Sequence, residues 1–385
     1  MKLVRRSYIV FVLLVALSIW VASVQFQQYL RTPLNIGESQ ELIVAKGSTF
    51  GQVMRELAER GLLEHPSLLQ MYIRFTKRGN RIHAGEYLLG QGTAPLDLID
   101  MLEQGNVRTH AITLVEGRTL AQLRAQIAKD NFLQKSLDKI GDNELLATLG
   151  IDVQPGRNAE GLFFPDTYVF SGATSDRDIL RQAYKRMEKV IDEEWSRRVE
   201  NLPYKNSYEA LIMASIIERE TGVASERPAI AGVFVRRLQS DMLLQTDPVV
   251  IYGMGAQFDG NLRRRDLENV DNPYNTYQLR GLPPTPIAAP GRAAIHAALH
   301  PSAGDALYFV AKGDGSHQFS ATLAEHEKAV KKFQIEQRRT DYQSQPEKLR
   351  IEKTMSLEKK PVEKKPVEKK QANRKDTNRK KQETK

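Results

Sequence analysis

Two glutamates follow a run of apolar residues in the middle of the chain. Glu218 and Glu220 come directly after Leu211–Ile217, with Arg219 between them. A carboxylic acid in apolar surroundings has its charged form disfavoured, so its pKa rises towards values that suit proton donation near neutral pH. Either glutamate is therefore a candidate general acid.

The spacing alone does not decide between the two carboxylates, because each shares a helix face with apolar residues of that run. The structural alternative is that both simply leave the core at the end of the helix. One of them would then pair with Arg219 or Arg227. On the residues alone, both interpretations stay open.

Two downstream segments gather amides, hydroxyls and aromatic rings, Leu244–Pro248 and Asn272–Tyr277. Sugars are bound by such combinations, because rings stack on pyranose faces while amides and carboxylates hold the hydroxyls. The alternative is ordinary loop chemistry, in which Asn and Asp form turns and Tyr packs against the core. The cluster therefore allows a sugar groove without requiring one.

A buried helix must position the two glutamates. Asn206 and Glu209 have capping-box spacing, which predicts a helix that begins near Ser207, and Gly222 suits its end. Because the run between them is apolar almost all round, the helix should be buried. Further helices are expected over Asp176–Arg198, Pro228–Ser240, Ala293–His300 and Leu323–Gln334, and long polar loops over Gly161–Tyr168, Leu244–Tyr252, Asn272–Tyr277 and Gly281–Gly291.

Residues 41–106 read as a small α+β module. Short apolar runs predict strands and helically spaced apolar positions predict helices. The expected order is a strand at Leu42–Val44, a helix from Thr49 to before Gly61, a helix at Pro66–Lys77, a strand at Ala84–Leu89 and a helix at Leu96–Leu102. A strand at Ala111–Val115 and a helix at Leu120–Ala128 then open a larger mixed α/β region, residues 107–335.

The N-terminus predicts a single membrane anchor within residues 1–30. Lys2, Arg5 and Arg6 precede Ser7–Leu30, which contains no charged residue, and the apolar run is close to the minimum of about 17 residues for a bilayer span. Basic residues before the span place the N-terminus in the cytoplasm and the rest of the chain outside the plasma (inner) membrane. The alternative is a cleavable signal with a site at Val21–Ser23.

The positive charge is concentrated at the other end of the chain. The 385 residues carry a net charge of +9, and Asp341–Lys385 contains 15 Lys and Arg against 8 Asp and Glu, so this segment accounts for +7. Its repeated Pro-Val-Glu-Lys-Lys units cannot form a core, which predicts a disordered basic tail over residues 336–385. The tail is either a solvated tether or a segment that binds an anionic polymer or lipid surface. The rest of the chain lacks the stripe of basic residues that is typical of nucleic-acid-binding proteins.

Several classes of chemistry are excluded by what the sequence lacks. The chain has no cysteine, which rules out disulfides, thiolate metal sites and a cysteine nucleophile. It has no nucleophile elbow, Walker loop or dinucleotide-binding glycine motif. His317 and His326 have no second ligand at metal spacing. We therefore expect no metal and no cofactor.

The order of motifs resembles the YceG-like (MltG) family of endolytic murein transglycosylases. Seven blocks carry the resemblance in the same order, behind the anchor: Glu160–Tyr168, Ala214–Thr221, Ala224–Arg227, Leu244–Pro248 with Ile251–Gly253, Pro273–Tyr277, Gly281–Gly291, and Leu307–Ala311 followed by His317 and Glu325-His326. The resemblance covers about residues 1–335. The tail has no counterpart in the family core.

The resemblance implies both an activity and a set of site residues. It implies that Glu218 is the catalytic acid and that the small module is LysM-like, a glycan-binding fold. Together with the loop chemistry, it suggests a substrate groove lined by Gln245, Asp247, Tyr252, Tyr274, Asn275 and Tyr277.

We therefore expect a membrane-anchored enzyme that cuts peptidoglycan strands internally, at the MurNAc-β-1,4-GlcNAc bond, and leaves 1,6-anhydro-MurNAc ends. Its partners would be glycan strands and, through family resemblance, peptidoglycan synthases. The alternatives are a glycan hydrolase and a non-enzymatic scaffold that binds the cell wall.

Overall fold

The computed structural model describes residues 2–79, 81–152 and 156–337. Within them, helices are combined with three two-stranded antiparallel sheets, which confirms the predicted α+β class. The predicted basic tail lies outside the described residues, apart from its first two positions.

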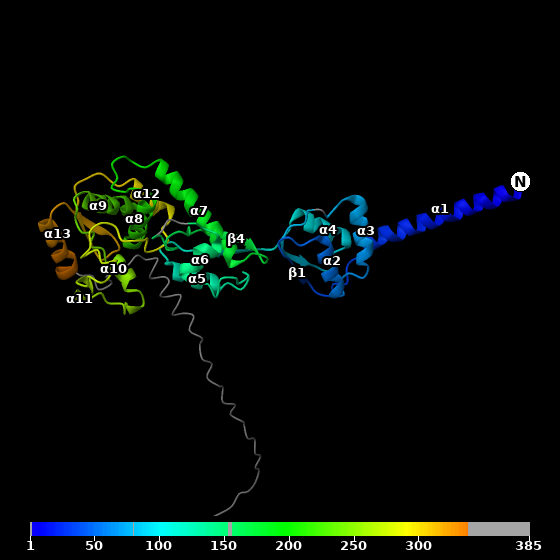
Figure 1. Cartoon of the computed structure of the whole chain (residues 1–385), viewed down its shortest axis with the longest axis horizontal. Helices are drawn as coiled ribbons and strands as arrows, with labels where there is room; N and C mark the ends of the chain where they lie inside the picture. Colours follow the sequence, from blue (N-terminus) through cyan, green and yellow to red (C-terminus); the bar gives the residue numbers. More distant parts are fainter. Residues whose placement is uncertain (1, 80, 153–155, 338–385) are drawn as a thin grey trace, which may run out of the picture.

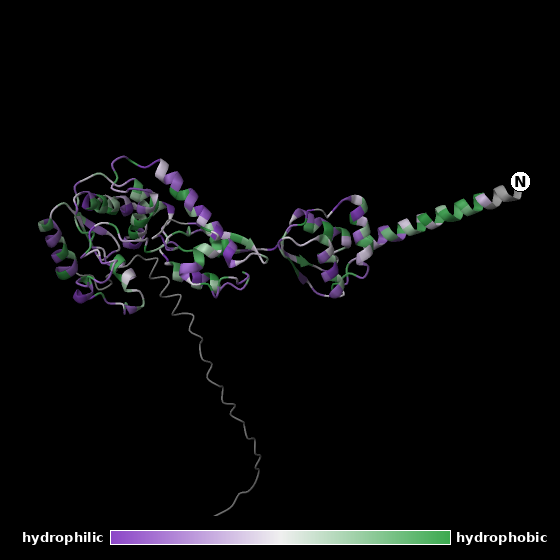
Figure 2. Ribbon diagram, viewed as in Figure 1, coloured by the Kyte–Doolittle hydropathy of each residue, from purple (hydrophilic) through white to green (hydrophobic). Residues whose placement is uncertain are grey.

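Helix α1 spans Lys2–Arg31 and projects from the body of the protein as a long rod (Figure 1). Within its segment Tyr8–Arg31, an 18-residue stretch has a mean hydropathy of 2.5, and none of that stretch is buried by another part of the structure. Figure 2 shows the apolar residues continuing along the rod. The helix is long and apolar enough to cross a membrane.

The small module consists of β1 (Gln40–Val44), α2 (Phe50–Glu59), α3 (Pro66–Thr76), β2 (Gly85–Leu89) and α4 (Pro95–Gln104). The two strands are antiparallel, with Leu42 opposite Tyr87. Thr49 and Gln52 form a capping box at the start of α2: each side chain accepts a hydrogen bond from the backbone N–H of the other residue. This capping box fixes the turn after β1. One core joins the strands to the helices, and the predicted order of the elements is confirmed.

The second sheet joins the small module to the larger region. Strand β3 (Thr109–Thr113) pairs antiparallel with β4 (Thr167–Ser171). Glu86 of the small module is buried at this junction. Its carboxylate oxygens lie 3.0 Å from His110 Nε2 of β3 and 3.3 Å from Arg108 Nη1, just before β3. Two helices lie between the strands in sequence, α5 (Leu120–Ala128) and α6 (Asp142–Leu149).

The larger core is built around α8 (Ser207–Glu220). Helix α12 (Arg292–Leu299) packs along α8, and α7 (Asp176–Ser196) and α9 (Arg227–Gln239) complete the group. All residues of α8 from Tyr208 to Glu218 are buried except Glu209. The predicted buried helix is therefore confirmed.

The remaining elements cover the end of this core: η1 (Ala224–Glu226), α10 (Asp247–Met254), η2 (Gly255–Gln257), α11 (Arg264–Leu267), β5 (Tyr308–Ala311), β6 (His317–Ser320), α13 (Leu323–Val330) and η3 (Lys331–Glu336). The expected loop Leu244–Tyr252 is wrong in its second half, which is helical. Asp247-Pro248 indicates a turn, but proline also fits the first turn of a helix, and α10 begins there. The predicted helix Leu323–Gln334 is α-helical only to Val330, and the chain then continues as the π-helix η3.

Candidate active site

Helix α8 carries Glu218 into the interior of the larger region. The Asn206 side chain caps the first turn by accepting a hydrogen bond from Glu209 N at 3.1 Å, as the sequence predicts. The apolar residues that follow fix the helix in the core, so Glu218 is only 6% exposed in the last turn.

Both oxygens of the Glu218 carboxylate accept hydrogen bonds. Arg227 Nη2 donates to Oε1 at 3.1 Å, and Gly291 N donates to Oε2 at 3.1 Å. The Arg227 side chain is as buried as its partner, at 5% against 3% exposure. Donors of this kind stabilise the charged form of a carboxylate.

A turn at Glu116–Thr119 forms another wall beside Glu218. Gly117 has a φ of +77°, and a Cβ atom there would lie 3.7 Å from Glu218 Cγ. Arg219 Nη1 donates to the Gly117 carbonyl at 3.0 Å. Backbone bonds of 2.8 Å in both directions join this turn to Ala289. The turn therefore packs directly against the end of α8.

The long loop Gly281–Gly291 is attached to α8 at two points. The buried Ser215 hydroxyl accepts a hydrogen bond from Ile287 N at 3.0 Å, and Gly291 reaches Glu218. The Glu116 carboxylate also packs on Gly291, where a Cβ atom would lie 2.0 Å from Glu116 Oε1. A larger residue at this position would therefore displace the Glu116 side chain.

Glu220 meets different surroundings on the same helical turn. Its carboxylate accepts a hydrogen bond from the Thr246 hydroxyl. Burial and, to a smaller extent, the nearby charge of Asp247 raise the pKa of Glu220 to about 7. The predicted effect of apolar surroundings on a carboxylic acid is thus found at Glu220, whereas Glu218 has an arginine partner.

Glu160 is another buried carboxylate of the larger region, and the sequence-based chemical argument missed it. Both of its oxygens accept from Leu120 N, at 2.9 and 3.1 Å, and Tyr252 Oη donates to one of them at 3.1 Å. Burial raises the pKa of Glu160 to about 7. Its only signal in the sequence is its place at the start of the Glu160–Tyr168 block.

The predicted groove residues fall into two groups. Near Glu220, Tyr277 Oη donates to Asp247 at 2.7 Å, and the exposed Gln245 is held with a φ of +49°. Near Glu160, the Tyr252 and Tyr274 rings meet edge to face, with their centroids 5.0 Å apart.

Asn275 is fully buried between these groups. Its amide donates to the backbone carbonyls of Asp266, Leu267 and Asn269, so it shapes a loop from below the surface.

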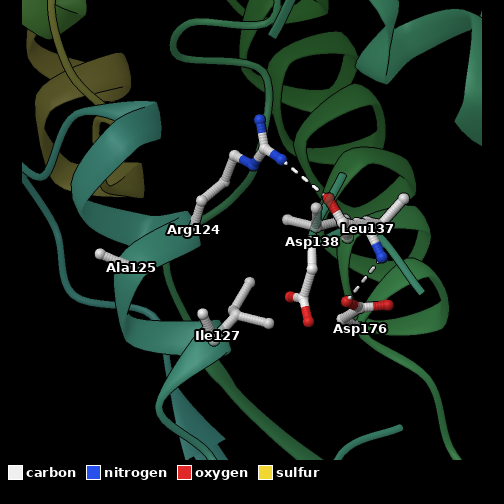
Figure 3. Close-up of a pocket in the computed structure, with 8 residues that line it drawn as sticks. Arg124, Ala125, Ile127, Leu137, Asp138 and Asp176 are labelled. Carbon is white, nitrogen blue, oxygen red and sulfur yellow. Dashed lines mark hydrogen bonds between the residues drawn. The ribbon is translucent and has the colours of Figure 1, made fainter. Parts of the chain in front are cut away.

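Two cavities lie on either side of α5. The larger, about 650 Å³, is lined by Glu160, Tyr252, Arg219 and the start of α5. The smaller, about 210 Å³, is shown in Figure 3, where Arg124 and Asp176 both bond to the Leu137 backbone. The polar groups of the smaller cavity are thus engaged in holding the fold together.

Three potential metal ligands meet at the end of α12, with their ligand atoms within 4.8 Å of one another: Glu194, His296 and His300. The same atoms have other partners. Arg292 and His296 contact the Glu194 carboxylate at 2.7 and 2.9 Å, and both ring nitrogens of His300 face backbone carbonyls. We assign no metal to this group.

Curated relatives cover most of the chain. An endolytic murein transglycosylase of Bacillus subtilis is 34% identical over 305 residues, which are 75% of this chain and 83% of that protein. Endolytic murein transglycosylases of two Streptococcus pneumoniae strains are 27% identical over 317 residues, and the chain spans 57% of their length.

A crystal structure of a yceG-like protein from Listeria monocytogenes matches with 29% identity and a TM-score of 0.47, and covers 76% of this chain and 99% of that one. The model of the YceG-like family matches residues 42–332, which include the small module, every segment around Glu218 and both groups of predicted groove residues. The chain therefore belongs to the YceG-like family.

Proposed function

We propose that this protein is a peptidoglycan lytic transglycosylase that cuts glycan strands internally, at the MurNAc-β-1,4-GlcNAc bond, with Glu218 as the catalytic residue. The names of its curated relatives support the activity. The observation that carries the choice of residue is the convergence on Glu218 of α9, the Gly281–Gly291 loop and the Glu116–Thr119 turn.

In the proposed reaction, one carboxyl group does the work of two. Glu218 first protonates the leaving glycosidic oxygen while positive charge develops at C1 of MurNAc. The resulting carboxylate then takes the proton of the C6 hydroxyl of the same sugar, and that oxygen bonds to C1. The product is a 1,6-anhydro ring, so neither a second carboxylate nor an activated water is needed.

The surroundings of Glu218 suit the carboxylate that forms between the two halves of this reaction. Arg227 and Gly291 N stabilise the negative charge that remains once Glu218 has given its proton to the leaving oxygen. The first half needs the protonated acid, and a bound strand that displaces water from the site favours that neutral form.

The groove is proposed to run past Tyr252 and Tyr274 on one side and Gln245, Asp247 and Tyr277 on the other, with Asn275 supporting the loop between them. The small module is proposed to be LysM-like and to bind the same strands. Helix α1 would anchor both in the plasma membrane with the N-terminus in the cytoplasm, close to nascent strands and the synthases that make them.

The test is the chemistry of the products. Purified peptidoglycan digested with the full-length protein should give fragments that end in anhydro-MurNAc, as identified by mass spectrometry. Fragments with reducing ends would indicate a hydrolase instead. Binding without cleavage would favour a wall-binding scaffold.

A further inference from the structure

The cavity of about 650 Å³ lies beside the proposed catalytic carboxylate. Arg219, the next residue after Glu218, forms part of its lining, and so does Thr119, two residues after the Gly117 that packs on Glu218. Its size falls within the range of about 300–1,000 Å³ that is usual for organic ligands. The cavity and Glu218 are thus joined by the neighbouring residue Arg219 and by the turn that packs on both.

The lining offers what an amino sugar needs. Pro248, Ile251 and Ile287 supply apolar surface, and the amides of Gln122, Asn143 and Asn158 surround it. Apolar surface suits the face of a pyranose ring and the methyl of an acetamido group, while side-chain amides can donate to and accept from the acetamido amide.

Buried polar groups hold the cavity wall in place. Glu160 is 5% exposed and joins the first turn of α5 to Tyr252 of α10. Tyr252 in turn packs on Tyr274. Because these contacts exist without a ligand, little ordering remains for binding to bring about, which favours affinity.

The charges around the cavity point to an uncharged ligand. Among its described lining residues, Arg219 is the one cation. Asp142 is paired with Arg124, and the Glu160 carboxyl is bonded to Leu120 N and Tyr252. A nucleotide or a polyphosphate is bound by several cations or by a glycine-rich anion cradle. Neither is found in this lining, so the cavity suits a glycan better than a phosphate.

We infer that this cavity is a subsite for the N-acetylated sugars that lie beyond the bond being cut, and that it recognises their acetamido groups. The inference rests on the proposed function, since it takes the cut to occur at Glu218. It gives a physical reason for cleavage inside a strand: the cavity is filled only when further sugars extend past the reacting pair.

The test uses two matched variants on one helix. Ala121 and Ala125 are both exposed residues of α5, one turn apart, but Ala121 lines the larger cavity and Ala125 the smaller one. Ala121→Trp should fill the proposed subsite, and Ala125→Trp adds the same bulk outside it. Because both positions are exposed, neither change disturbs the core, and circular dichroism verifies this.

Binding is measured with chitohexaose, the N-acetylated hexasaccharide. Each protein is full-length, is kept in detergent, and also carries Glu218→Gln, which prevents turnover. Ala121→Trp should weaken binding about tenfold or more, and Ala125→Trp by less than about twofold. Cellohexaose, which lacks the acetamido groups, should bind to Ala125→Trp about tenfold more weakly than chitohexaose, and Ala121→Trp should reduce this preference. A preference that arises in the small module would be the same in both variants. Equal binding of chitohexaose by the two tryptophan variants, or the same preference in both, would overturn the inference.

Cleavage by the corresponding enzymes with Glu218 intact separates this inference from the proposed function. If the Ala125→Trp enzyme makes anhydro ends and the Ala121→Trp enzyme does so with an unchanged KM, the subsite is wrong and the function stands. If the wild-type protein makes no anhydro ends, the function is wrong, and the subsite fails with it as a part of the catalytic site.

Discussion

The two carboxylates in the last turn of α8 can be compared directly, because the same helix holds them and only their surroundings differ. Glu218 accepts from the buried Arg227 guanidinium and from Gly291 N. Glu220 accepts from the neutral Thr246 hydroxyl and lies near the negative Asp247, so its pKa rises to about 7. At Glu218, a guanidinium and a backbone N–H stabilise the charged form of the carboxyl group. At Glu220, burial favours the neutral form.

The comparison shows that apolar surroundings do not identify a catalytic acid. With a pKa of about 7, Glu220 has the value expected of a proton donor near neutral pH. The position that several segments enclose, however, is Glu218. The following predictions test which of the two properties matters, in order of decreasing effect.

The largest effect should follow from removing one carboxylate at a time. Glu218→Gln should lower the rate of anhydro-end formation by about 10²–10⁴-fold or more, because the same group serves as acid and base. Glu220→Gln, the matched control two residues away, should keep the rate within about tenfold. Mass spectrometry of the digests measures both, and the opposite ranking would assign the chemistry to Glu220.

Breaking the buried ion pair should destabilise the fold. Arg227→Met removes a charged partner of the buried Glu218, which should lower the free energy of unfolding by about 3–5 kcal/mol. Urea denaturation of the variant and the wild type measures this difference.

The double variant Glu218→Gln with Arg227→Met is the control for that experiment. It removes both charges and should recover part of the stability lost in the single variant. A loss below about 1 kcal/mol in Arg227→Met would mean that the pair behaves like an exposed one.

The raised pKa of Glu220 predicts a pH dependence of stability. Its carboxyl titrates near 4.5 in the unfolded chain and near 7 in the folded one, so the folded state binds the extra proton between these values. Stability therefore falls as the pH rises from about 4.5 to about 7. Glu220→Gln should remove about 2–3 kcal/mol of this fall.

Glu160 has a pKa of about 7 as well and should keep its own contribution in that variant. The free energy of unfolding of Glu220→Gln should therefore fall less steeply with pH than that of wild type, but it should still fall. Curves of wild type and Glu220→Gln that stay parallel would show that Glu220 is ionised throughout.

The smallest effect is expected at Tyr277. Tyr277→Phe removes the hydroxyl that donates to the exposed Asp247 at 2.7 Å, which should cost about 1 kcal/mol. Activity should stay within about threefold, because the bond lies on the Glu220 side of α8. A loss of activity comparable to that of Glu218→Gln would extend the reacting site to this side.

Local signals explain which elements could be predicted. Helix α5 begins and ends at the predicted residues, and its start is fixed by a capping box between Thr119 and Gln122. Helix α8 begins where Asn206 predicts. For α10 the local signal was ambiguous, because Asp-Pro is common both in turns and at helix starts.

The surroundings of the glutamates could not be predicted in the same way. Gly291 is 73 residues from Glu218 in sequence, and Gly117 is 102 residues from Arg219. Nothing in the pattern around Glu218 indicates that these two backbones approach it. The family resemblance selected Glu218, whereas the physical argument from apolar surroundings applied equally to Glu220.

The junction between α1 and the small module has a mechanical consequence. Leu30 is 1% exposed in the module's core, Tyr29 Oη donates to His65 O at 2.8 Å, and the Phe26 ring lies 6.3 Å from that of Tyr72. The end of the helix is thus packed into the module's core, and the two are not joined by an unpacked linker. If the helix spans a bilayer as proposed, these contacts would hold the module at the membrane surface, and the part of the cell wall within its reach would be the layer nearest the membrane.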